Sequence, residues 1–165
     1  GWTGAGFGAF NQTAGQAHHT DGQNVAFSNG GTVSQLLAET LQANINYQLS
    51  VDIVDRFDIS SVGYSVGLYA DGVLLGEDNS GAVPATNGDF LTSLVSLDIG
   101  AAHPQLGEQL EIRLSSTGVQ TNFDNVRLSS QSLVAVPEPA SVVIRVLIGL
   151  GLAGFGYNRI IHRKG

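Results

Sequence analysis

The chain has 165 residues, of which 42% are hydrophobic and 13% are charged, with 22 glycines and neither cysteine nor methionine. That length supports one domain with a single buried core. The composition excludes a coiled coil and a disordered chain, and the lack of cysteine excludes disulfide scaffolds, thiol nucleophiles and thiolate metal sites. Because a translated chain begins with methionine, we expect a processed form or an internal fragment, and any export signal would precede Gly1.

The net charge of −7 is divided unevenly along the chain. Residues 1–136 contain three basic and thirteen acidic residues, a net charge of −10, whereas residues 137–165 contain four basic residues and one acidic residue, a net charge of +3. An acidic body repels phosphate backbones, so nucleic-acid binding is disfavoured and cations such as calcium are favoured over anionic partners.

Short stretches of alternating polarity, separated by glycine, asparagine and aspartate, predict antiparallel strands with one buried face. In chain order, the expected strands are 24–27, 32–37, 47–53, 64–68, 73–76, 91–99, 110–114 and 122–128. Residues 34–43 have roughly helical leucine spacing, but strand and loop fit the surrounding pattern better. About eight short strands predict an all-β protein, an antiparallel β-sandwich of the jelly-roll kind over residues 1–132.

Two local features refine this expectation. Asp71 and Gly72 lie between two predicted strands, and the pair tolerates positive φ angles, so a tight hairpin turn is expected there. Further along, Phe123 is apolar in one register whereas Val126 and Leu128 are apolar in the other, which predicts a bulge near residues 124–125. Such a bulge either re-aims side chains at a functional site or is an irregularity without function.

The chain changes character after Val136, where Pro137, Glu138 and Pro139 are followed by a long apolar stretch and a basic end. Residues 133–139 are expected to form a linker, because the prolines interrupt regular structure. Residues 140–161 span about 33 Å as a helix, enough to cross a membrane, and the basic residues after them favour the cytoplasmic side. Arg145 lies inside this stretch, near enough to its start for its side chain to reach the headgroups.

This tail resembles the PEP-CTERM sorting domain, in which a Pro-Glu-Pro motif, an apolar helix and a basic end follow one another over residues 136–165. The resemblance implies a single C-terminal helix and basic tail at 140–165 that anchor the chain transiently in the inner membrane. It also implies exosortase as a partner, cleavage near the motif, and release to the cell surface or the extracellular matrix.

The body resembles the galactose-binding-like jelly rolls of carbohydrate-binding modules, on the residues Gly1-Trp2, 21–28, 47–52, 111–114 and 122–128. Members of that group usually have an earlier strand, so the resemblance implies a domain that lacks its first strand. It also implies an exported module that binds carbohydrate or extracellular polysaccharide.

Sugar binding needs a flat aromatic ring and a few fixed polar groups. The aromatic candidates are Trp2, Phe10, Tyr64, Tyr69 and Phe90, and each of them could instead be part of the core. The polar candidates are Asp52, Arg56, Arg113 and Asp124, which could instead form ordinary surface ion pairs.

Calcium is the metal that this acidic body favours, because a hard cation takes six to eight oxygen ligands. Related jelly rolls often hold a structural calcium, and the resemblance carries that ligand role to Asp124. The other candidate oxygen ligands are Asp21, Asp71, Glu77, Asp78 and Asn79, and those at residues 71 and 77–79 suit ordinary turns equally well.

An enzymatic alternative remains open, because the body is also similar to the indole-terpenoid cyclases of the hapalindole type. That similarity implies a calcium-containing jelly roll in which Asp124 is the general acid. Burial would keep Asp124 protonated, and Tyr64 and Phe90 would stabilise a cationic intermediate. A passive matrix protein that binds calcium and polymer without a pocket is the third possibility.

Overall fold

The computed structural model describes residues 1–11, 19–54, 63–79, 90–118 and 120–133. These residues form ten strands and no helix. The strands are β1 (Thr3–Gly4), β2 (Phe7–Asn11), β3 (Asn24–Ser28), β4 (Thr32–Thr40), β5 (Ile45–Val54), β6 (Tyr64–Ala70), β7 (Val73–Asp78), β8 (Phe90–Ile99), β9 (Gln109–Ser116) and β10 (Thr121–Ser132).

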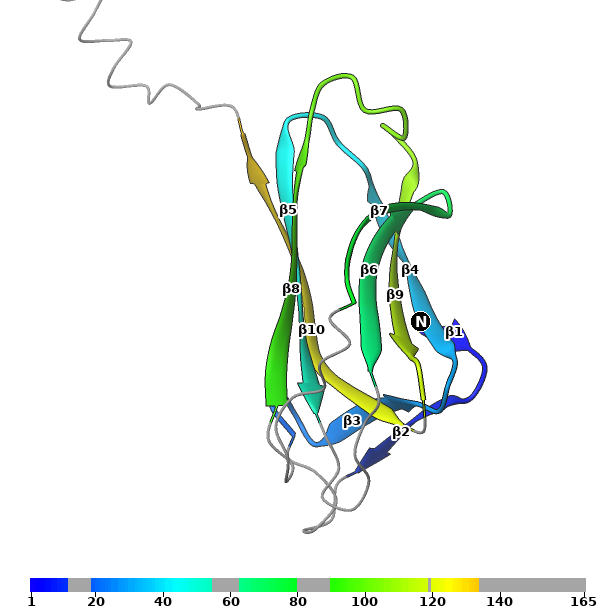
Figure 1. Ribbon diagram of the computed structural model, residues 1–165. Coiled ribbons are helices and arrows are strands. Elements are labelled where there is room, and N and C mark those ends of the chain that lie inside the picture. The colour runs from blue at the N-terminus through cyan, green and yellow to red at the C-terminus, as the bar shows by residue number, and fades with distance from the viewer. Residues whose placement is uncertain (12–18, 55–62, 80–89, 119, 134–165) are drawn as a thin grey trace, which may run out of the picture. The chain divides into compact units, whose positions relative to one another are not determined.

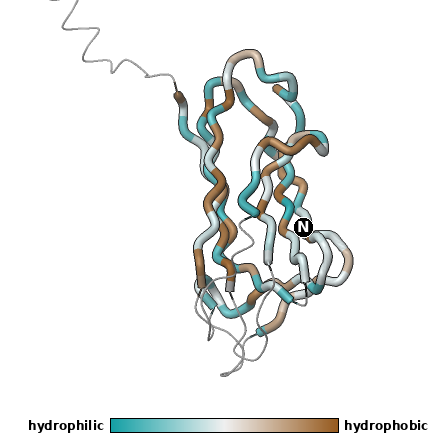
Figure 2. The backbone as a smooth tube through the Cα atoms, in the orientation of Figure 1, coloured by the Kyte–Doolittle hydropathy of each residue, from teal (hydrophilic) through white to brown (hydrophobic). Residues whose placement is uncertain are grey.

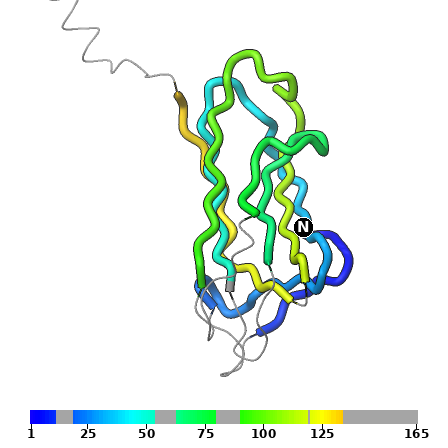
Figure 3. The backbone as a smooth tube through the Cα atoms, viewed as in Figure 1, coloured from blue at the N-terminus to red at the C-terminus, as the bar shows by residue number. Residues whose placement is uncertain are grey.

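Two five-stranded antiparallel sheets form a sandwich (Figure 1). The first sheet, which we call sheet A, has the strand order β1-β4-β9-β6-β7, and the second, sheet B, has the order β2-β3-β10-β5-β8. Figure 3 shows how the chain crosses between the sheets, so that strands from its two ends become neighbours. In sheet B, for example, Phe123 of β10 pairs with Ala26 of β3. The predicted antiparallel sandwich is therefore confirmed.

The alternating segments became strands whose apolar face enters the space between the sheets. Tyr47, Leu49, Val51 and Ile53 of β5 are all buried, as their spacing predicts. The segment with helical leucine spacing is the strand β4, which confirms the choice of strand over helix. Figure 2 shows the same alternation of hydrophobic and hydrophilic residues along the strands.

The core between the sheets consists mainly of aliphatic side chains. Its buried members are Val33, Leu41, Tyr47, Leu49, Val51, Ile53, Tyr64, Val66, Leu68, Ala70, Val95, Ile99, Leu110, Ile112, Leu114 and Phe123. Each buried side chain of Val, Leu, Ile or Phe size contributes about 1.5 to 3 kcal/mol relative to exposure, so this cluster is the main stabilising term of the fold.

The hairpin between β6 and β7 has the predicted turn. Asp71 and Gly72 have φ angles of 47° and 74°, and Ala70 pairs with Val73 across the turn. Two successive positive φ angles give the twist that suits a two-residue hairpin, which is why Asp-Gly is favoured there.

The predicted bulge in β10 is also present. The register between β10 and β5 shifts between Asp124 and Arg127, and Asn125 has a φ angle of 50°. The extra residue lets Phe123 pair with Ile53 and Leu128 pair with Leu49, so that both apolar side chains enter the core.

The chain divides into two units, residues 1–133 and residues 134–165, of which only the first is described. The expected linker, sorting motif and apolar helix therefore lie outside the described residues, and the predicted domain boundaries in that part stay predictions. Within the residues that the structure does describe, no helix is long and apolar enough to cross a membrane.

Candidate functional site

Two buried carboxylates lie side by side on the outer face of sheet B. Asp124 of β10 pairs directly with Asp52 of β5, and their exposed fractions are 8% and 4%. Their neighbours Phe123 and Ile53 point into the core, so alternation along the strands places both carboxylates on the opposite face. Sequence reasoning selected both residues but did not place them together.

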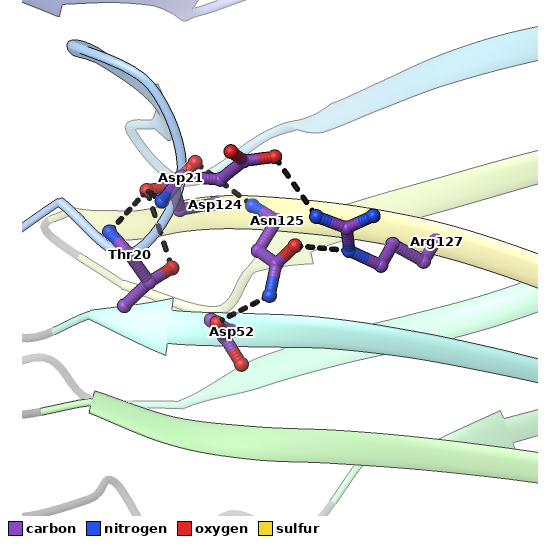
Figure 4. Close-up of polar contacts among 6 residues, drawn as sticks. All are labelled: Thr20, Asp21, Asp52, Asp124, Asn125 and Arg127. Carbon is purple, nitrogen blue, oxygen red and sulfur yellow. Dashed lines mark hydrogen bonds and ion pairs between the residues drawn. The ribbon is translucent and has the colours of Figure 1, made fainter.

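The carboxylate of Asp124 holds the segment that follows residue 18 (Figure 4). Its Oδ2 accepts hydrogen bonds from the backbone N–H groups of Thr20 and Asp21, at 2.6 and 3.0 Å, and from the Thr20 hydroxyl at 3.2 Å. Its Oδ1 accepts a bond from the backbone N–H of Asn125 at 2.8 Å. Three of these four donors come from a segment more than 100 residues earlier in the chain, so the buried carboxylate of Asp124 clamps that segment to β10.

Asp52 is held by side chains from both neighbouring strands. Thr92 of β8 donates to Oδ1 at 2.7 Å, and the amide of Asn125 donates to Oδ2 at 3.0 Å. Burial alone would raise the pKa of Asp52, but these hydrogen bonds, with a further one from Thr20 and the charge of Arg127, together lower it. Asp52 is therefore ionised in the folded protein at neutral pH.

Among the described residues, Arg127 supplies a positive charge that acts on Asp52. Its Nε donates to Oδ1 of Asn125, and its terminal NH2 group lies 3.2 Å from Oδ2 of Asp21 (Figure 4). Both side chains of that ion pair are more than half exposed, so the pair contributes little to stability. Asn125 thus links the exposed arginine to the buried Asp52.

These contacts do not suit a metal ion at Asp124. A calcium ligand set consists of oxygen atoms, whereas Asp124 is surrounded by N–H and O–H donors. Within the described part of the chain, no group of three or more His, Cys, Asp or Glu side chains is placed to hold a metal ion.

A cavity of about 710 Å³ is bordered by residues of both sheets, Asp124 and Asn125 among them. Its wall consists largely of apolar side chains and includes Trp2, the single tryptophan of the sequence. The lining residues are Trp2, Phe7, Gly8, Ala9, Asn24, Ala26, Val33, Gln35, Leu37, Glu39, Tyr47, Leu110, Ile112, Leu114, Phe123, Asp124, Asn125, Val126, Leu128, Ser129 and Ser130. This volume suits a drug-sized, mostly apolar ligand.

The predicted site residues are dispersed over the molecule. Trp2 lines the cavity, and Asp52 and Asp124 form the carboxylate pair. Arg113 lies elsewhere, in sheet A, where its guanidinium is 2.6 Å from Glu111 and 4.1 Å from the centre of the Tyr69 ring. Arg56 lies outside the described residues.

Tyr64 and Phe90, two of the aromatic candidates, do not contribute to a shared site. Tyr64 is 1% exposed and donates a hydrogen bond from its hydroxyl to Asp78, so it is a core residue and offers no open ring face. Phe90 is 51% exposed and does not line the cavity. The predicted wall of Tyr64 and Phe90 is therefore not formed around this cavity.

Sequence reasoning did not select Gln35 and Glu39, the polar residues that β4 contributes to the cavity wall. A usable signal was present, because Val33, Gln35, Leu37 and Glu39 share one parity of the strand. Polar residues at the apolar parity of a strand indicate a wet or ligand-lined part of the inner face.

Comparisons with known proteins give the class. A family model described as HpiC1-like, HpiC1 cyclase, matches residues 1–129. The chain therefore belongs to the HpiC1-like cyclase family. No curated protein matches the sequence of the chain.

Solved structures agree with this family. A cyclase from Fischerella sp. TAU is 27% identical with a TM-score of 0.70, over 78% of this chain and 76% of that one. The same identity and coverage hold for a Fischerella sp. TAU cyclase in complex with 4-(1H-indol-3-yl)butan-2-one, with a TM-score of 0.68. The xylan-binding domain of Paenibacillus barcinonensis Xyn10C is 14% identical with a TM-score of 0.55, over 82% of this chain and 88% of that domain, and shares the fold alone.

The main functional interpretation of the sequence is thereby corrected. The chain is assigned to a cyclase family and not to PEP-CTERM exosortase substrates with a carbohydrate-binding body. The predicted partners, exosortase and polysaccharide, are therefore wrong as well. A solved relative binds a small molecule instead. The physical reason is that strand spacing and turn residues describe the sandwich architecture, which binding modules and cyclases have in common.

Proposed function

We propose that this protein is a cyclase that closes a ring in an apolar, indole-bearing small molecule bound in the cavity between the sheets. The observation that carries the proposal is the cavity of about 710 Å³, lined mainly by apolar side chains, in a member of a cyclase family. It is supported by a solved relative at 27% identity that holds an indole compound.

The aromatic and apolar side chains of the cavity wall suit a ring closure that passes through a cation. Trp2, Phe7 and Phe123 present aromatic side chains, and aromatic faces stabilise cationic intermediates by about 0.5 to 2 kcal/mol each. Apolar walls also displace water, which would otherwise quench a reactive cation. An indole substrate would gain about 25 cal/mol for each Å² of apolar surface buried.

The role of Asp124 as general acid stays a prediction. Asp124 borders the cavity, but its carboxylate accepts four hydrogen bonds on the outer face of sheet B. An acid must reach the substrate with a proton, whereas these contacts fix the segment at Thr20 and Asp21. The acid role requires that Asp124→Asn abolish turnover at a temperature where the variant is folded.

Calcium likewise stays a proposal that rests on resemblance. An ion bound at Asp124 would have to displace the N–H donors of Thr20 and Asp21. If calcium binds there, adding it raises the melting temperature of the wild type and not that of Asp124→Ala. If the wild type melts at the same temperature with calcium and with a chelator, Asp124 is not a calcium ligand.

The cyclase proposal is tested by binding and by turnover. Binding of 4-(1H-indol-3-yl)butan-2-one is measured by calorimetry in the wild type and in two tryptophan variants. Ala9→Trp fills the cavity from the exposed strand β2 and should abolish binding, whereas Gln48→Trp, on an exposed position outside the cavity, should leave it unchanged. Turnover is followed with an isoprenylated indole by chromatography and NMR, because ring closure by isomerisation leaves the mass unchanged. Binding that is equal in all three proteins contradicts the cavity as the site.

A further inference from the structure

The strand β4 brings one carboxylate to the cavity wall. Val33, Gln35, Leu37 and Glu39 have the same parity, and all four line the cavity. The pairing of β4 with β9 shifts between Leu36 and Thr40, so four residue steps of β4 face two of β9. Irregularities of this kind re-aim side chains and are over-represented beside functional sites.

Glu39 lies at this irregularity without any hydrogen-bond or ion-pair partner among the described residues, and it is exposed. Asp124 is the other acidic residue in the lining, and its carboxylate is occupied by the clamp to Thr20 and Asp21. Glu39 is therefore the carboxylate that a ligand in the cavity can meet at the rim.

The charge of the lining is one-sided. Among the described residues that border the cavity there are two acidic side chains and no lysine, arginine or histidine. An anionic ligand would meet repulsion without a compensating donor, whereas a positive charge or an N–H group would meet an acceptor. Gln35 also lines the cavity from the same face of β4 and is less exposed than Glu39. Its side-chain amide adds a neutral donor and a neutral acceptor to the wall.

We propose that Glu39 sets the charge selectivity of the cavity, so that it accepts indole ligands with a positively charged or N–H-bearing side chain and rejects those with a carboxylate or phosphate. This inference rests on the proposed function, because it concerns the ligand of the same cavity. Glu39 acts as a binding residue that contacts the polar end of the ligand, while the apolar wall holds the ring.

The test compares three probes of similar size by calorimetry: tryptamine, which is cationic, indole-3-propionate, which is anionic, and the neutral 4-(1H-indol-3-yl)butan-2-one. We expect the wild type to bind tryptamine about tenfold more tightly than indole-3-propionate, because an exposed charge pair changes affinity by severalfold in each direction. In Glu39→Gln the ratio should fall to about one, while affinity for the neutral ketone is kept. The difference should also shrink as salt is raised.

Glu108→Gln is the matched control, since it removes the same charge from an exposed position outside the cavity. It should keep the selectivity of the wild type. Thermal unfolding of each variant establishes that it is folded. If the neutral ketone binds but the wild type does not discriminate the charged probes, or if Glu39→Gln still discriminates, the inference about Glu39 is overturned alone. If none of the three indoles binds the wild type, the proposed function fails together with the inference.

Discussion

Asp124 and Asp52 are direct partners across β10 and β5, and both carboxylates are buried on the outer face of sheet B. Two buried carboxyl groups so close together each need their own hydrogen-bond donors, because a buried polar group without a partner is costly. Asp124 accepts hydrogen bonds from four donors, and Asp52 accepts hydrogen bonds from the side chains of Thr92 and Asn125. The pair therefore holds four segments of the chain together: residues 20–21 and the strands β5, β8 and β10.

Replacing Asp124 tests this clamp. In Asp124→Asn, one of the two oxygens becomes an NH2 group, so either the donors of Thr20 and Asp21 or the backbone N–H of Asn125 lose their acceptor. We expect the free energy of unfolding to fall by about 1 to 3 kcal/mol, because buried donors lose their acceptor. Chemical denaturation measures the change. Asp21→Asn, which affects only an exposed ion pair, should cost less than about 1 kcal/mol, and an equal loss in both variants contradicts the clamp.

Asp52 should make stability dependent on acidic pH. Its pKa is lowered in the folded protein, so the unfolded chain takes up the proton first as the pH falls. The stabilisation is fully present above about pH 4, the ordinary range of an aspartate, and is lost as the pH falls through the lowered pKa. Urea unfolding between pH 2 and pH 6 should give a shallower acid loss in Asp52→Asn than in the wild type. Parallel curves for the two proteins would show that Asp52 is not responsible.

The contact among Tyr64, Asp78 and Ser93 should behave as a coupled unit. The hydroxyls of Tyr64 and Ser93 both donate to Oδ2 of Asp78, at 3.0 and 2.6 Å. We expect Tyr64→Phe and Ser93→Ala to cost about 1 to 2 kcal/mol each, because each removes a hydrogen bond to a charged group. In the double-mutant cycle, a coupling of at least about 0.5 kcal/mol is expected, since the two donors share one acceptor. Strictly additive losses would show that the two bonds are independent.

Arg113 should prove dispensable for ligand binding. It contacts Glu111 and the ring of Tyr69 and does not line the cavity. Arg113→Ala should therefore lower the free energy of unfolding by about 1 kcal/mol or less, as expected for a partly exposed ion pair, and leave indole binding unchanged. The pKa of Glu111, which is lowered mainly by its hydrogen bond from Arg113, should rise in this variant. Loss of indole binding in a folded Arg113→Ala protein would contradict the placement of the ligand in the cavity.

The sequence by itself determined much of the local structure of the described residues, although β1 and β2 were not predicted. Alternation along 47–53 predicted a strand with Tyr47 and Ile53 in the core, and Asp71-Gly72 predicted a hairpin turn. The change of parity between Phe123 and Val126 predicted the bulge. These features follow from the two-residue period of a strand and from the φ angles that a few residue types tolerate, both of which are encoded within a few positions.

Only the tertiary structure decided which distant residues meet. Thr20 and Asp124 are 104 positions apart, and nothing in the sequence near either one specifies the other. Tyr64 looked like a possible ligand platform until the packing of the sheets buried its ring. Glu39 lies at an apolar parity of its strand, but only the structure shows that β4 and β10 border one cavity. A site in a sandwich combines strands that are far apart in the sequence. Its residues therefore depend on the order of strands in each sheet, which local sequence patterns do not encode.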